Sequence, residues 1–203
     1  MKKLMFNDKF GLTEAVLEGR KTMTRRLVPE KLLEEYYDYD DYVLAVAPRD
    51  IPCSREYEEE FFTRRSPFKV NEIVAVAQNL RDMGYDPRST PGGAIWGLDH
   101  TPAWTNKMFV SSGQCIHQVR IKDVRVERMQ DITDEDCLKE GVRPVGSEYT
   151  VGNYMIGVGR GFMRTSLFKT PREAFAALVE KVSEKGSWRD NPYVFVYEFE
   201  LVK

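Results

Sequence analysis

The sequence has few of the residues that hold metals or disulfides. Its 203 residues include three cysteines, Cys53, Cys115 and Cys137, and two histidines, His100 and His117. The cysteines are odd in number and widely spaced, without a Cys-x-x-Cys pair, which favours a reduced, cytoplasmic setting over a disulfide framework. Structural zinc sites take closely spaced cysteine and histidine ligands. We therefore expect no metal site, and we expect no cofactor.

Long apolar runs and an excess of charge of one sign are also absent. The first apolar run, Leu4 to Phe6, is too short for the core of a signal peptide, and no later stretch approaches the length of a membrane span. The chain has 30 Lys+Arg against 32 Asp+Glu, a formal net charge of -2. This balance argues against a protein that coats nucleic acid through many phosphate contacts. We expect a protein without a membrane segment, in which any contact with nucleic acid is local.

The patterns that are present predict an α+β fold. Hydrophobic residues make up 42% and charged residues 31% of the chain, which is typical of a globular protein. Apolar and alternating patterns predict strands over residues 3–6, 70–78, 116–129 and 193–202, and the last of these has one wholly apolar face. Helical spacing predicts one helix that begins near Leu12 and ends at Gly19. Two further helices are predicted over residues 134–140 and 171–182, each preceded by a capping threonine.

Three long stretches between these elements are weakly patterned. They cover about residues 29–67, 81–113 and 143–169, and stretches of this length in a compact domain are usually functional or disordered. The first contains an acidic and aromatic run over residues 34–42, which would repel nucleic acid. We interpret this run as lying away from a nucleic-acid cleft or as contacting another protein. No internal repeat is visible, so we expect a single domain over residues 1–203.

The densest chemical feature is the segment Gly19-Arg20-Lys21-Thr22-Met23-Thr24-Arg25-Arg26. Its four basic residues and two hydroxyl groups follow a predicted helix end. One interpretation is a solvated basic turn. The other is an anion or nucleotide site, in which guanidinium groups bind phosphate and hydroxyl groups address a base or sugar.

The same segment, read as Gly19-Arg20-Lys21-Thr22-x-Thr24-x-Arg26, resembles the signature of ASCH domains, which are small relatives of the PUA domain. Three further pieces agree in order: Lys69-Val70-Asn71-Glu72, Ile132-Thr133-x-x-x-Cys137-x-x-Glu140-Gly141, and the closing Tyr197-Glu198-Phe199. The matching pieces are spread over nearly the whole chain but cover only about half of its residues, so the three long stretches look like insertions. It implies a small, mixed, PUA-like β-barrel with flanking helices and a cleft for RNA or a nucleobase.

One small bacterial branch of this family is an amidohydrolase that removes the acetyl group from N4-acetylcytidine with a lysine, a threonine nucleophile and a glutamate. The resemblance places these catalytic roles on Lys21, Thr24 and Glu140. A threonine hydroxyl needs a neighbouring base. Lys21 can serve only if burial and nearby arginines lower its pKa by roughly 3 from about 10.4. An ionised Glu140 opposes that change, so the pair is either a structural salt bridge or a coupled acid/base pair.

Geometry adds a condition. In a regular strand the side chains of Lys21 and Thr24 would point to opposite faces, so joint action requires a turn or bend between them.

The other candidate residues are assigned to ligand binding. They lie in the basic segment, at the end of the strand over residues 70–78, and in a glycine-rich loop: Arg20, Arg25, Arg26, Gln78 and Arg160. Four aromatic residues, Tyr85, Trp96, Trp104 and Phe109, either stack a base or anchor the second long stretch.

Three functions therefore stand side by side. The leading hypothesis is a protein that binds RNA, a nucleobase or a modified nucleoside in a cleft. The first alternative is an amidohydrolase acting on an N4-acetylcytidine-like substrate. The second alternative is a protein-interaction module that uses the acidic run over residues 34–42. Whether the protein is an enzyme stays open at this point.

Overall fold

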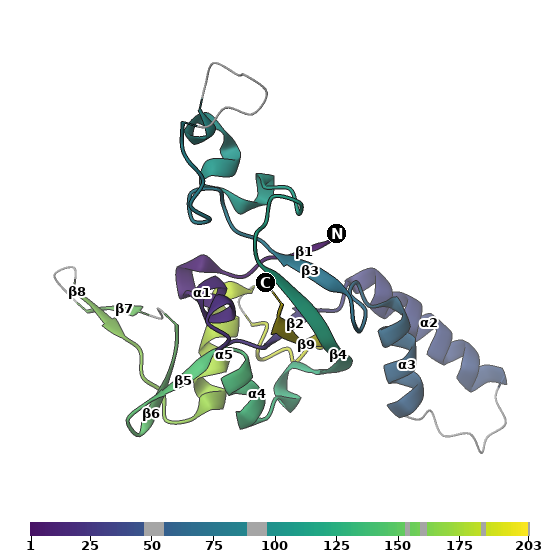
Figure 1. The fold of residues 1–203 in the computed structure, drawn as a ribbon. Helices are drawn as coiled ribbons and strands as arrows, with labels where there is room; N and C mark the ends of the chain where they lie inside the picture. The colour runs from purple at the N-terminus through teal and green to yellow at the C-terminus, as the bar shows by residue number, and fades with distance from the viewer. Residues whose placement is uncertain (47–54, 89–96, 153–154, 159–161, 184–185, 203) are drawn as a thin grey trace.

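The fold is centred on a five-stranded sheet (Figure 1). A computed structural model describes the chain except for residues 47–54, 89–96, 153–154, 159–161, 184–185 and 203. The strand order in the sheet is β1-β3-β4-β9-β2. The strands are β1 (Lys3–Leu4), β2 (Met23–Leu27), β3 (Ile73–Val76), β4 (Gln118–Arg128) and β9 (Tyr193–Leu201). The α+β class and the four predicted strands are confirmed.

The sheet is open but curled. β1 runs parallel to β3, and the other neighbouring strands are antiparallel. No ladder joins β1 to β2 within the described residues, so backbone pairing does not close the sheet into a barrel there. Arg26 of β2 nevertheless donates a hydrogen bond to the carbonyl of Met5, just after β1. Its guanidinium also lies 5.8 Å from the centre of the Phe6 ring. The two edges of the sheet therefore approach each other.

Three of the α-helices in the described residues lie where the sequence predicts helices, and the other two lie within residues 29–67. They are α1 (Leu12–Leu17), α2 (Glu30–Val46), α3 (Arg55–Arg65), α4 (Asp134–Lys139) and α5 (Pro171–Val182). Thr133 caps α4 by accepting from the Asp136 N–H, and Thr170 caps α5 in the same way. None of the helices in the described residues combines the length and the apolar character that a bilayer crossing requires.

The core lies on both faces of β9. The sequence predicted one buried face for this strand, but four successive residues, Val194 to Tyr197, are at most 1% exposed. On one face, Phe62 of α3 packs against Phe195 with ring centres 6.4 Å apart. On the other face, Arg25 lies opposite Val196 and its guanidinium is 5.8 Å from the Phe175 ring of α5. Helices cover both sides of the sheet, and this is why both faces of β9 are apolar.

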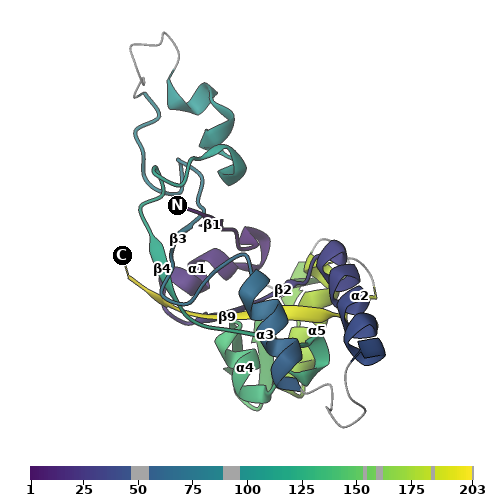
Figure 2. The same cartoon turned by 90° about the vertical axis from the view of Figure 1, so that its right-hand side faces the viewer.

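The three long stretches contain regular structure. Residues 29–67 hold α2 and α3, which project together from one side of the sheet, so the acidic run is helical (Figures 1 and 2). Residues 81–113 hold the 3₁₀ turns Leu98–His100, Pro102–Trp104 and Lys107–Phe109. Residues 143–169 contain most of two hairpins, β5 (Val142–Val145) with β6 (Glu148–Val151) and β7 (Met155–Val158) with β8 (Phe162–Thr165).

The aromatic residues of the second stretch have separate positions. Tyr85 and Trp104 pack against a small core cluster that includes Leu80, Leu98 and Val110, as the anchoring interpretation predicts. Phe109 is 64% exposed and does not anchor the stretch in this way. Trp96 lies outside the described residues.

Candidate functional site

Lys21 lies in the short connection between α1 and β2. Gly19 takes the left-handed conformation (φ 72°) that ends the preceding helix, and the Lys21 N–H then donates to the Ala15 carbonyl at 2.8 Å. Regular pairing with β9 begins at Met23, so Lys21 precedes the strand that contains Thr24. Lys21 thus lies outside the regular strand, and both Lys21 and Thr24 line one pocket, as their joint action requires.

Glu140 provides the partner of Lys21. It is the last residue of the α4 turn, and Gly141 follows it with φ 101°. The Lys21 Nζ contacts Glu140 Oε2 and also donates to the Glu140 backbone carbonyl at 2.9 Å. The two side chains are 2% and 4% exposed, so both charged groups of the pair are buried.

The surroundings of Lys21 act on its protonation in opposing directions. Burial lowers the pKa of the Lys21 amine below its ordinary value because it disfavours the charged form. Glu140 opposes this effect, and the positive charges of Arg26 and Arg25 add to the lowering. The net direction is downward, which is the direction that a lysine base needs at neutral pH.

Lys21, Thr24 and Glu140 line one pocket, which we call the Lys21 pocket. Its volume is about 100 Å³, and its apolar wall includes Phe175, Leu178 and Val179 of α5. A wider groove of about 770 Å³ shares part of this lining, including Phe6, Arg26 and Ser183. The Lys21 pocket is therefore the inner end of a larger depression along β2, the edge strand of the sheet.

Thr24 presents an uncommitted hydroxyl to the Lys21 pocket. The residue is 4% exposed and lies on β2 opposite Tyr197 of β9. Its side-chain oxygen forms no hydrogen bond with another described residue. The hydroxyl lines the pocket without a protein partner, so this group is available to a ligand.

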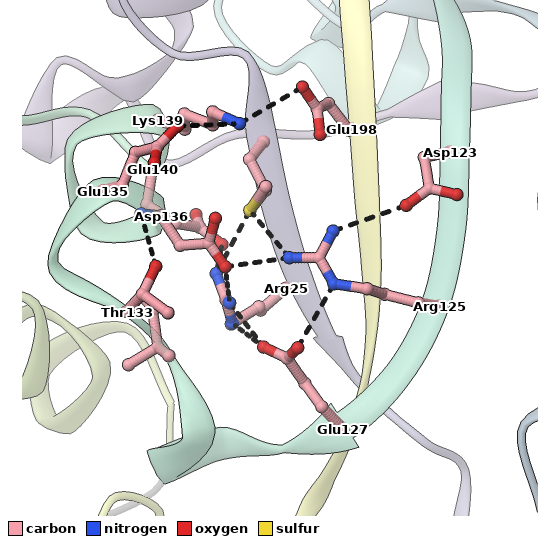
Figure 3. A network of polar contacts seen from close by, with 12 residues as sticks. Arg25, Asp123, Arg125, Glu127, Thr133, Glu135, Asp136, Lys139, Glu140 and Glu198 are labelled. Atoms are coloured by element: carbon pink, nitrogen blue, oxygen red, sulfur yellow. Dashed lines mark hydrogen bonds and ion pairs between the residues drawn. The ribbon is translucent and has the colours of Figure 1, made fainter.

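Arg25 faces the protein rather than the solvent (Figure 3). Its side chain is 2% exposed and contacts carboxylates from β4 and α4. Arg25 Nη2 lies 2.5 Å from Glu127 Oε1 and 3.0 Å from Asp136 Oδ2, while Nη1 lies 3.2 Å from Glu140 Oε1. These carboxylates raise the pKa of Arg25, although burial acts against them, so the guanidinium stays charged.

Among the predicted binding residues that the structure describes, Arg25 and Arg26 line the Lys21 pocket, whereas Arg20 and Gln78 do not. The exposed Arg20 pairs with Glu18 at 2.5 Å. Gln78 is buried and lies 2.5 Å from His117 Nδ1, and it lines a different cavity together with Asp8 and Asp82. Arg160 lies outside the described residues. Arg26 and Arg25 line both the Lys21 pocket and the groove.

Sequence reasoning missed two parts of the site. The apolar residues of α5 were assigned to the core, and their spacing gives no sign that they also form the wall of a pocket. Arg125 and Glu127 were read only as residues of a strand. The alternation of charge in Arg125-Val126-Glu127 was the available signal, but it did not identify Arg25 as the partner.

Neither a metal centre in the described residues nor a relative of the chain was found. Within the described residues, no group of three or more His, Cys, Asp or Glu side chains is arranged to hold a metal ion. Comparison of the chain with protein-family models, curated proteins and solved structures found no match.

Proposed function

We propose that this protein binds an uncharged ligand that contains a nucleobase, such as a modified nucleoside, in the Lys21 pocket. The observation that carries the proposal is the convergence of Lys21, Thr24 and Glu140 on one pocket that also has an apolar wall. A few converging polar groups in an otherwise apolar pocket are typical of small-molecule sites.

The shape of the site fits a base attached to a sugar. A nucleobase has apolar ring faces and a polar edge, so the α5 wall supports packing of a face while Thr24 and Lys21 support hydrogen bonding to the edge. Pockets that enclose a complete ligand usually measure about 300–1,000 Å³. At about 100 Å³, the Lys21 pocket has room for a ring or an acyl group, and the sugar would occupy the groove.

The charge of the site favours a nucleoside over RNA. Lys21 and Arg25 are buried against carboxylates, and Arg20 is paired with Glu18. Among the described lining residues, Arg26 is the only exposed cation. RNA binding draws much of its affinity from many phosphate contacts. The basic segment therefore offers little unneutralised charge to a polyanion.

Calorimetry with cytidine, N4-acetylcytidine, cytidine 5′-monophosphate and a short oligoribonucleotide tests this proposal. We expect the wild type to bind a nucleoside with little dependence on salt between 50 and 200 mM, and the phosphate to add no affinity. Ser183→Trp, at the junction of pocket and groove, should weaken binding at least tenfold. Ser147→Trp, at an exposed turn, is the matched control and should bind normally. Steeply salt-dependent binding of the oligoribonucleotide alone would contradict the proposal.

A second candidate function is hydrolysis of an N4-acylated cytidine, and the uncommitted Thr24 hydroxyl in the same pocket as Lys21 specifically favours it. Neutral Lys21 would accept the Thr24 proton as Oγ1 attacks the acyl carbonyl carbon. The bond from this carbon to N4 then breaks, and the amine leaves with the proton from Lys21. Water hydrolyses the resulting threonine ester, and Glu140 assists proton transfer.

Release of acetate from N4-acetylcytidine tests the catalytic candidate. Thr24→Ala should abolish turnover and Thr24→Ser should retain part of it. Thr22→Ala is the control, because Thr22 does not line the Lys21 pocket. Absence of turnover by the wild type would contradict hydrolysis of this substrate. The binding proposal would not be affected, because calorimetry tests it separately.

We also propose that the chain is a member of the ASCH family with a PUA-like arrangement of the sheet. The basic segment supports this proposal, as does the order in which the four sequence pieces occur along the chain. The approach of Arg26 to Met5 across the open edges is compatible with a barrel-like curl. The assignment of residues 29–67, 81–113 and 143–169 as insertions stays a prediction. So do the cytoplasmic location and a protein partner for residues 34–42.

A further inference from the structure

All donors of Arg25 are used within the protein. A guanidinium has five N–H groups. Nε donates to Glu127 at 3.1 Å, and Nη2 donates to Glu127 at 2.5 Å and to Asp136 at 3.0 Å. Nη1 donates to Glu140 at 3.2 Å and to the Met23 sulfur at 3.4 Å. Five donors meet five acceptor contacts, so Arg25 has no N–H left for a ligand.

A second arginine closes this network into a ring (Figure 3). Arg125 of β4 contacts Asp136 Oδ2 at 2.8 Å and Glu127 Oε2 at 3.2 Å, and these are the carboxylates that also bind Arg25. Two arginines and two carboxylates therefore alternate around the ring, and their charges balance. The ring fastens β2 to β4 and α4.

Glu140 is attached to this ring through Arg25 alone among the ring members. One of its oxygens, Oε1, faces Arg25 and the other, Oε2, faces Lys21. Both carboxylate oxygens are thus committed, and the group is held between two cations. We propose that Arg25, although it lines the Lys21 pocket, is a positioning residue that fixes the orientation of Glu140 against Lys21 and donates no hydrogen bond to the ligand. This inference rests on the proposed function of the Lys21 pocket.

The charges that face Lys21 make its pKa depend on Arg25, and this dependence can be measured. They are Glu140 at the end of α4 and Arg25 and Arg26 of β2. Arg25 acts on Lys21 in two ways, by its own positive charge and by sharing Glu140. Loss of Arg25 removes a nearby like charge and leaves Glu140 to Lys21 alone, and both changes favour the protonated amine.

Titration of Lys21 by NMR, with ¹³Cε-labelled lysine and Lys21→Met for assignment, tests the inference without any ligand. Arg25→Gln should raise the pKa of Lys21 by about one pH unit. Arg125→Gln is the matched control, because Arg125 belongs to the ring but does not contact Glu140. It should move the titration by much less. Equal shifts in the two variants, or no shift in Arg25→Gln, would overturn the inference.

Arg25→Lys keeps the charge but loses the forked donors, and it covers the case in which Arg25→Gln fails to fold. We expect this variant to retain a low pKa of Lys21 but to bind nucleoside about tenfold more weakly, since Glu140 is no longer fixed. Affinity equal to that of the wild type would contradict the positioning role. A wild type that binds no nucleoside would defeat the proposed function, whereas the Lys21 titration would still decide the role of Arg25.

Discussion

The basic segment over residues 20–26 and the acidic run on α2 carry dense charge of opposite sign, and the fold treats them differently. Lys21 and Arg25 are buried against carboxylates from α4 and β4. Glu34 and Asp38 of α2 are exposed to solvent. The formal net charge of -2 conceals this division. Dense charge in a sequence becomes a candidate site where the fold removes it from water.

The positions of the two segments explain the difference. Residues 20–26 pass along the edge of the sheet, near α1, α4 and α5, where burial forces Lys21 and Arg25 to find partners. α2 is attached by its apolar side instead. Tyr36 packs with ring centres 5.3 Å from Phe61 and 4.8 Å from Phe62. The acidic side chains of the run can then remain in water at low cost.

The largest expected effect comes from breaking a buried pair. Glu140→Gln leaves Lys21 without its carboxylate and should reduce the free energy of unfolding by about 3–5 kcal/mol in urea denaturation. Glu34→Gln removes an exposed carboxylate from α2 and should change it by less than about 0.5 kcal/mol. Equal effects of the two variants would erase the contrast between the segments.

A somewhat smaller effect should locate the attachment of α2. Tyr36 is buried and Tyr37, its neighbour, is 50% exposed. Truncation of a large buried aromatic costs about 3 kcal/mol or more, so Tyr36→Ala should lower the midpoint of urea denaturation clearly. Tyr37→Ala should have little effect. If Tyr37→Ala were the more damaging change, the assignment of the packed side of α2 would be wrong.

The stability of the protein should depend on pH through Cys137, on the buried side of α4. Burial raises the pKa of the Cys137 thiol to about 12. In the unfolded chain the thiol loses its proton near pH 8.5, so the unfolded state binds fewer protons above this pH and stability falls as pH rises. The limit of this slope is about 1.4 kcal/mol per pH unit for one group. Urea denaturation between pH 8 and 10 should show a shallower decline in Cys137→Ala, and an unchanged slope would contradict the assignment.

The smallest effect should come from neutralising the acidic side of α2. The triple variant Glu34→Gln/Asp38→Asn/Asp41→Asn alters exposed residues that do not line the Lys21 pocket. Calorimetry should find nucleoside affinity within about twofold of the wild type, because water and salt screen charges at this distance. A tenfold change would show that the acidic helix acts on the pocket and would break the separation between the two regions.

Local signals made much of the fold predictable. Gly19, Thr133 and Thr170 mark helix ends through their own backbone or capping chemistry, which does not depend on the rest of the chain. The helices α2 and α3 were missed because their main apolar contacts, such as Tyr36 with Phe62, exist only once the two helices lie side by side. A pattern within one helix does not reveal such a pair.

The candidate site was predictable to a similar degree. The sequence motif includes Lys21, Thr24 and Glu140. Strand geometry alone predicts that joint action of Lys21 and Thr24 requires a bend between them. The partners of Arg25 were not predictable. Glu127 and Asp136 lie more than 100 positions away in the chain, and their approach depends on how β4 and α4 pack. The sequence does not distinguish an arginine that is exposed to ligand from one that is buried against carboxylates.

The most direct test is a crystal structure of Thr24→Ala with bound N4-acetylcytidine. We predict that the base or its acetyl group enters the Lys21 pocket, within hydrogen-bond distance of Lys21 or Glu140, with the sugar in the groove beside Arg26. A separate cavity of about 520 Å³, lined by residues that include Glu58, Arg128 and Tyr193, provides the contrasting location. Density for the nucleoside in that cavity, or none in the Lys21 pocket at saturating concentration, would contradict the proposed function.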